Sequence, residues 1–210
     1  MITLFNEDFS SFRVGDFPYE TFLGAMGEYH YRPKEWYGGQ WYDPTPLPGT
    51  GGIKSWMIME QDGKKYIEYS ARLMDDVRWL LILATGDDMW TDYRLSATVR
   101  KFLTKSQSGI LFRYQSSQCF YNLCLDNGQI VLYKKHYGEV TTLASRPFDY
   151  SSDTDCRLTV EAQGDELRCS ADGQPVFTVR DGTYRSGRIA LGTLGVARYT
   201  GIKVEMETET

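Results

Sequence analysis

Histidine is scarce in this sequence, and the residue spacings that hold zinc are missing. The 210 residues include two histidines, His30 and His136, and four cysteines. No CxxC or HxxxH spacing occurs, so a metal site of the His/Cys type is not supported. We also find no readable Ser-His-Asp arrangement and no glycine-rich phosphate loop that leads from a strand into a helix.

Long apolar runs and basic runs are also missing. The net charge of −5 gives no electrostatic case for nucleic acid as a partner. No segment approaches the roughly 18 apolar residues that span a bilayer. The first residues, MITLFNEDFSSF, lack the charged and apolar regions of a signal peptide. If Met1 is the native start we expect a cytoplasmic protein; if the chain is an excised domain, its parent could be secreted.

Helical periodicity never lasts longer than a turn or two, and strand patterns take its place. Short alternating segments, separated by glycine-based turns every eight to twelve residues or so, predict an antiparallel sandwich or barrel. Val77 to Thr85 is an almost continuous apolar run, which predicts a central strand. We find no linker and no repeat, so residues 1–210 are expected to form one all-β domain with a polar tail at 206–210.

The centre of the prediction is Ser108 to His136, which reads as three consecutive strands. Asn127-Gly128 predicts a type I′ turn, because both residues tolerate positive φ. The turn sets Leu125 opposite Ile130, Leu123 opposite Leu132 and Cys124 opposite Val131. The four Leu and Ile side chains of the first two pairs then share one face, which must be core.

The opposite face of these strands carries polar groups. Asn122 and Tyr133 pair there, and if Ile110, Phe112 and Tyr114 point at the core, Arg113 joins them. An arginine, an amide and a tyrosine on one face can hold a ligand, but they also describe an ordinary solvated face. The residues leave both interpretations open.

Residues 10 to 53 differ from the rest, because they are rich in glycine, proline and aromatic residues and have little periodicity. Disordered segments are poor in Trp and Tyr, so we expect an ordered aromatic flap over one side of the sheet. Its rings could stack on sugars or pack the flap onto the sandwich; they are Trp36, Tyr37, Trp41 and Tyr42. Glu28 and His30 alternate around Tyr29, so both could point the same way.

The four cysteines are expected to be free and mostly buried. Cys119 and Cys124 lie five residues apart on one predicted strand, and a turn at Gly164-Asp165 sets Cys169 opposite Val160, four residues from Cys156. These separations exceed the roughly 7 Å limit for a disulfide. A bridge between the two groups remains open, but four thiols suit a reducing compartment better.

Several phrases of the sequence are similar to one fold family. They are WTDYRLSATVRKF, SGILFRYQ, FYNLCLDNGQIVLYKK, RLTVEAQGDELRCSADGQPVF, SGRIALGT and YTGIKVE. Together they cover about residues 54 to 206 and resemble the concanavalin A-like jelly roll, with laminin G-like domains, fructan-binding carbohydrate-binding modules and 3-keto-disaccharide hydrolase domains among its branches. The resemblance implies a two-sheet antiparallel β-sandwich, and residues 10 to 53 match none of its phrases.

The resemblance also implies site residues. In the hydrolase and fructan-binding branches a phrase like SGILFR brings an arginine to the sugar-facing surface, and Arg113 matches it. The carboxylate that the hydrolase branch carries on the next strand is absent, because Asn122 and Cys124 occupy those positions. Jelly-roll sugar binders often hold a structural calcium ion near the joined termini, where Glu7 or Asp8 and Glu205 could supply oxygen ligands. A plain acidic edge that discourages aggregation is the alternative.

Three functional hypotheses follow. The first is a non-catalytic carbohydrate-binding domain for a glycan end or short oligosaccharide, using Arg113, His30, Trp36 or Trp41, Asn122, Tyr133 and Glu28. The second is a small glycoside-processing enzyme with a carboxylate pair, for which Glu28 and Glu68 are the main candidates. The third is an assembly domain with an exposed apolar patch formed by Leu111, Cys124 and Val131.

Overall fold

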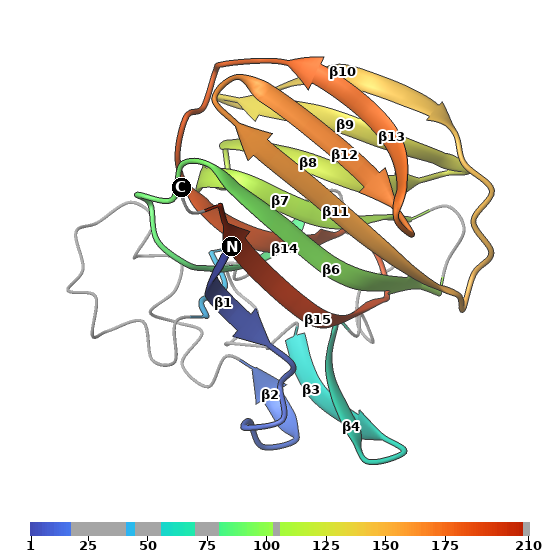
Figure 1. The fold of residues 1–210 in the computed structure, drawn as a ribbon. Coiled ribbons are helices and arrows are strands. Elements are labelled where there is room, and N and C mark those ends of the chain that lie inside the picture. The colour runs from blue at the N-terminus through green and yellow to red at the C-terminus, as the bar shows by residue number, and fades with distance from the viewer. Residues whose placement is uncertain (18–40, 45–55, 70–79, 103–105, 208–210) are drawn as a thin grey trace.

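The computed structural model describes residues 1–17, 41–44, 56–69, 80–102 and 106–207. These residues form strands joined by turns and loops, with no helix among them, in two antiparallel sheets that face each other (Figure 1). Within this part of the chain, no helix could cross a membrane. The all-β sandwich expected from the sequence is confirmed.

The larger sheet has nine strands in the described residues, and β1 pairs with β15 beside the main path. In order across the sheet, the main path runs through β13 (Gln174–Arg180), β12 (Glu166–Ala171), β11 (Asp155–Gln163), β6 (Tyr93–Lys101), β15 (Ala197–Met206), β4 (Lys64–Tyr69), β3 (Trp56–Gln61) and β2 (Gly15–Phe17). The strand β1 (Ile2–Glu7) places Thr3 opposite Glu205 and Glu7 opposite Ile202.

The smaller sheet has six strands and carries the segment on which the sequence prediction was centred. Its order is β10 (Glu139–Pro147), β9 (Gln129–His136), β8 (Cys119–Asp126), β7 (Gln107–Ser116), β14 (Arg188–Thr193) and β5 (Leu81–Thr85). The run predicted as a central strand forms β5, which is the last of the described strands in this sheet. On its other side Ala84 forms an isolated bridge with Tyr42, so among the described strands β5 does not have the central position that was expected.

The turn at Asn127-Gly128 has the predicted geometry. Both residues have positive φ, at 44° and 77°, and the three expected cross-strand pairs are present in β8 and β9. The Leu and Ile side chains of the inner pairs are fully buried between the sheets. The alternation of side chains between two faces predicts the pairing of β8 with β9 correctly, because one face of these strands is core and this fixes their register.

A single core fills the space between the sheets. Its largest side chains include Trp41, Trp56, Phe112, Tyr121 and Tyr199. All four cysteines are free and buried, as expected.

A second cluster of buried residues lies on the outer face of the six-stranded sheet. Its members from that sheet are Ile82, Ala84, Leu111, Tyr114, Phe120, Cys124, Tyr133 and Ala190. Leu111 and Cys124 are fully buried, so they do not form the exposed apolar patch that the assembly hypothesis required.

Candidate functional site

The outer face of the six-stranded sheet holds a row of polar side chains across three adjacent strands. Gln107, Tyr133 and Asn122 come from β7, β9 and β8. Asn122 Nδ2 donates to the Tyr133 hydroxyl at 2.9 Å, and that hydroxyl donates to Gln107 Oε1 at 3.1 Å. We call these three residues the amide–tyrosine row. The predicted pairing of Asn122 with Tyr133 is confirmed.

The row passes from the surface into the buried cluster. Gln107 is partly exposed, Tyr133 is 6% exposed and Asn122 is fully buried. Burial raises the pKa of Tyr133, so its hydroxyl remains a proton donor. Asn122 Oδ1 has no hydrogen-bond partner in the part of the chain that the structure describes. A buried acceptor without a partner costs about 1–3 kcal/mol, which a hydroxyl donor would recover.

Arg113 does not join this face, which corrects the sequence prediction. A bulge between Phe112 and Ser116 breaks the alternation of β7, and Arg113 itself has a φ of 45°. Phe112 therefore faces the core, while Tyr114 belongs to the outer cluster instead. One inserted residue moves the side chains after it to the other face.

The guanidinium of Arg113 is fully buried and bound by the loops at one end of the sandwich. Its Nη1 donates to Gly164 O at 2.7 Å and to Tyr184 O at 2.9 Å. Nε and Nη2 each donate to Thr91 O at 3.3 Å, and Nη2 lies 3.2 Å from Asp92 Oδ1. Arg113 is thus saturated by the protein, and this arrangement supports a structural role.

Gly187 allows the backbone to approach the bulge. It has a φ of 144°, and a Cβ there would lie 2.5 Å from the Arg113 carbonyl carbon. The Arg113 amide donates to the Tyr93 hydroxyl at 2.7 Å. These long-range contacts, which no local sequence pattern encodes, determine the direction of the arginine.

A second polar cluster ties the connection between β13 and β14 to the six-stranded sheet. Asp181 accepts from Lys134 Nζ at 2.6 Å, from the Tyr121 hydroxyl at 2.6 Å and from the Thr183 amide at 2.9 Å. Burial alone would raise the pKa of Asp181, but the hydrogen bonds from Lys134, Thr183 and Tyr121 outweigh it and lower the pKa well below its usual value. Sequence analysis did not single out this cluster.

The remaining predicted ligand residues are placed as follows. Trp41 is 2% exposed; its ring packs on Phe5 and Phe9, and its Nε1 donates to Glu7 Oε2 at 3.4 Å. It is a core side chain, so it offers no open face for stacking. Glu28, His30 and Trp36 lie outside the described residues, as does most of the segment predicted to form the aromatic flap.

The catalytic candidate Glu68 is held in an ion pair. Its Oε2 accepts from Nε and Nη2 of Arg198 at 3.3 and 3.2 Å, and Arg198 lies opposite it on β15. A catalytic carboxyl must be within hydrogen-bond reach of the group to which it transfers a proton, whereas this oxygen is held by two nitrogens of the neighbouring arginine. This geometry does not support Glu68 as the acid of a glycosidase pair.

The two carboxylates expected near the termini do not converge. Glu205 lies opposite Thr3, whereas Asp8 follows Glu7 at the other end of β1, roughly 15 Å away along the strand. Glu205 is paired with Lys203, and Asp8 accepts from the Ser10 amide. No group of three or more His, Cys, Asp or Glu residues in the described ranges is arranged to hold a metal ion. Asp8 and Glu205 therefore do not fit a shared calcium ion.

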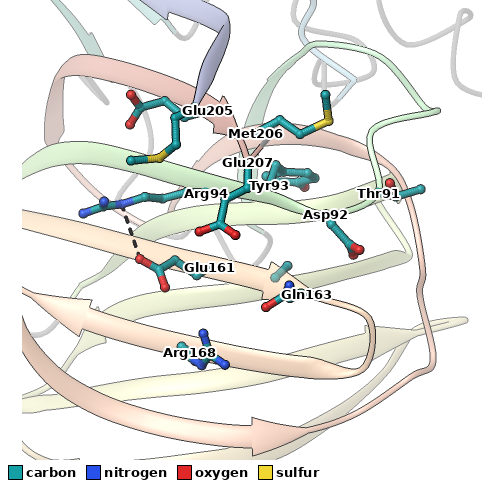
Figure 2. A pocket seen from close by; sticks show the side chains of 12 residues that line it. Thr91, Asp92, Tyr93, Arg94, Glu161, Gln163, Arg168, Glu205, Met206 and Glu207 are labelled. Atoms are coloured by element: carbon teal, nitrogen blue, oxygen red, sulfur yellow. Dashed lines mark ion pairs between the residues drawn. The ribbon is translucent and has the colours of Figure 1, made fainter. Parts of the chain in front are cut away.

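A shallow cavity of about 720 Å³ lies against the outer face of the nine-stranded sheet (Figure 2). Its floor includes a row across four strands with alternating charge, namely Arg168, Glu161, Arg94 and Glu205. The dashed line in Figure 2 marks the ion pair between Arg94 and Glu161, whose closest atoms are 3.6 Å apart. Among the described residues of its lining, Tyr93 is the only aromatic one, and it is 4% exposed. This surface has the character of a solvated sheet face.

No family model and no curated protein sequence matches this chain. Solved structures share its fold. It is similar to the carbohydrate-binding module CBM66 from Bacillus subtilis, with a TM-score of 0.63, 13% identity and coverage of 80% of this chain and 96% of that one. A protein of unknown function with a galectin-like fold from Bacillus subtilis has a TM-score of 0.55 at 12% identity, covering 72% and 86%.

A third likeness is to the GH43 protein BlXynB from Bacillus licheniformis, with a TM-score of 0.55 and 14% identity, covering 81% of this chain and 37% of that one. Because the sequence identities to these three structures are low, the similarity shows a shared fold alone. The chain is a jelly-roll β-sandwich of the kind found in carbohydrate-binding modules and galectin-like proteins.

Proposed function

We propose that this chain is a carbohydrate-binding domain that recognises an oligosaccharide without cleaving it. The observation that carries the proposal is the amide–tyrosine row on the outer face of the six-stranded sheet. It links a partly exposed Gln107 through Tyr133 to the buried amide nitrogen of Asn122, and the amide oxygen of Asn122 has no partner in the described part of the chain. Sugar hydroxyls both donate and accept hydrogen bonds, so they match a row of this composition.

The fold supports the same proposal. The likeness to a carbohydrate-binding module covers 96% of that module, so the two share the domain as a whole. Function in a shared fold still depends on the site, and the row includes a buried acceptor, Asn122 Oδ1, that has no partner among the described residues. The ion pair between Glu68 and Arg198 favours binding over hydrolysis among the hypotheses drawn from the sequence.

A glycan array followed by isothermal titration calorimetry tests the proposal. The array should include neutral, acidic and amino-sugar oligosaccharides, and we expect saturable binding to at least one class. Tyr133→Phe removes the hydroxyl at the centre of the row and should weaken binding by about tenfold or more, since it leaves two partners unpaired. Wild-type protein that binds no glycan on the array would reject the proposal.

Tyr150→Phe is the matched control. The Tyr150 hydroxyl also makes two hydrogen bonds, accepting from the Lys101 amide at 2.7 Å and donating to Thr154 O at 2.7 Å. Tyr150 lies in the connection between β10 and β11, and both of these hydrogen bonds are to residues outside the row. We expect Tyr150→Phe to lose stability comparably but to bind glycan like wild type.

A further inference from the structure

Tyr137 stands at an unusual position in the fold. Four turns in the described residues begin with a non-glycine residue of positive φ and continue with a glycine of positive φ. They are Asp62-Gly63, Asn127-Gly128, Tyr137-Gly138 and Asp172-Gly173, with first-residue φ angles of 53°, 44°, 47° and 49°. Three of them use Asp or Asn, whose side chains tolerate this conformation, and the fourth uses tyrosine.

The energetic cost of a positive φ at Tyr137 is not offset by burial of its side chain. Phe9 and Arg113 also combine a large side chain with positive φ, but both are fully buried and held by hydrogen bonds. Tyr137 is 81% exposed, and its ring makes one edge contact with His136, with 4.6 Å between centroids. Strained, exposed residues of this kind concentrate at binding sites.

The neighbours of Tyr137 offer hydrogen-bonding groups. The Tyr184 hydroxyl donates to Lys135 O at 2.7 Å, so its contact of 2.9 Å with His136 Nδ1 must use a proton on that nitrogen. In the neutral imidazole this leaves His136 Nε2 as an acceptor. Gln118, from the turn between β7 and β8, is exposed, and its Oε1 would lie 3.5 Å from a Cβ at Gly138.

We propose that the Tyr137 ring is an aromatic contact for the glycan, with His136 Nε2 and the Gln118 carboxamide receiving its hydroxyls. This inference rests on the proposed function and adds a contact at the β9–β10 turn, at one end of the sheet. A tyrosine ring gives a large, rigid contact with an apolar face at low entropic cost. Tyr133 lies four residues earlier on β9, about 13 Å away along the strand, and it faces the outer cluster whereas His136 contacts the core residue Tyr184. A ligand that reaches both Tyr133 and Tyr137 must therefore be an oligosaccharide that passes over the end of the sheet.

The test uses Tyr137→Asn. This substitution gives the turn the same first residue as the Asn127-Gly128 turn in the same sheet. The glycan array and calorimetry are repeated beside a thermal melt. We expect affinity to fall by at least about tenfold, since an aromatic anchor is lost. We also expect Tm to rise by roughly 2 °C or more, because the strain at the turn is relieved. Tyr137→Phe should keep wild-type affinity.

Asn127→Tyr is the matched control, because it places the same side chain at the same φ in another turn. It should lower Tm and leave glycan binding unchanged. A Tyr137→Asn protein that binds as tightly as wild type, or that melts at a lower temperature, overturns the inference while the proposed function stands. Wild-type protein that binds no glycan overturns both. A wild-type dimer in gel filtration that Tyr137→Asn dissociates, with no glycan bound, would assign the ring to self-assembly instead.

Discussion

Arg113 shows how one buried cation organises the loops at one end of the sandwich. Its guanidinium gathers the carbonyls of Thr91, Gly164 and Tyr184, which belong to three separate connections. Burial lowers the pKa of Arg113 and the charge of Asp92 partly offsets this effect, but an arginine side chain stays protonated in proteins. The five N–H donors of the planar fork allow one side chain to hold all three loops.

Replacing Arg113 by methionine should therefore destabilise the fold strongly. The change leaves three carbonyls without their donors, and we expect a loss of about 3 kcal/mol or more in the free energy of unfolding. Urea denaturation measures it. Arg180→Met, at a side chain that is 68% exposed and paired with Asp165, should cost less than about 1 kcal/mol. Equal losses in the two variants would contradict the role assigned to Arg113.

Asp181 makes the fold sensitive to acid. Its folded pKa lies below the unfolded value of about 3.9, so its stabilisation is present above that value and is lost as the pH falls through the folded pKa. Asp181→Asn should lower stability by about 2 kcal/mol at pH 7, because three donors lose a charged acceptor. We expect the gap between wild type and variant to shrink below about pH 4 in urea titrations. A gap that stayed constant down to pH 2 would argue against this assignment.

At the scale of the elements, two glycines allow close packing on the outer face of the six-stranded sheet. Gly192 and Gly109 lie side by side on β14 and β7, and Cys124 follows on β8. A Cβ at Gly192 would lie 2.5 Å from Leu111 Cδ1. The side chain of Leu111 therefore occupies the space beside Gly192, and β8 lies close against Gly109.

Gly109→Ala should be one of the most damaging single changes in this sheet. The new Cβ would lie 2.3 Å from Leu123 O and 2.6 Å from Cys124 Cα, and both are backbone atoms that cannot rotate away. We expect a loss of about 3 kcal/mol or more, seen as a lower urea midpoint. Gly182→Ala is the comparison, since its Cβ would meet only the mobile end of Arg185 and should cost about 0.5 kcal/mol or less. A Gly109→Ala protein as stable as wild type would show that β7 and β8 can separate.

For the whole molecule, the thiols report on global folding. Burial raises the pKa of Cys156 and of Cys169 to about 12, and it raises the pKa of Cys124 as well. The thiolate is the reactive form, so a thiol-specific reagent should react slowly with the native protein. After denaturation the same reagent should label all four cysteines. Fast reaction of several groups in the native state would mean that the sandwich opens readily.

Much of the fold was predictable because several strands alternate between core and outward-facing side chains, as β6 and β11 do, and because their turns have distinctive residues. The turn at Asn127-Gly128 defined the register of β8 and β9 from local sequence alone. The position of β5 was not predictable, because an entirely apolar strand carries no sign of whether it lies in the centre or at the margin of a sheet.

The candidate site was predictable only where alternation holds. Asn122 and Tyr133 share a face as expected. Arg113 was misplaced because a bulge is set by distant contacts, here with Tyr93 and Gly187. Tyr137-Gly138 could have been noticed as a turn between two strand patterns, with a tyrosine where Asn or Asp is usual.

The alternating row Arg168, Glu161, Arg94 and Glu205 has a kinetic consequence. Its charges cancel over distances shorter than the Debye length of about 8 Å at physiological ionic strength. The row itself therefore projects little long-range field and adds little to the steering of a charged partner. Removing the whole row should leave the salt dependence of an association rate nearly unchanged.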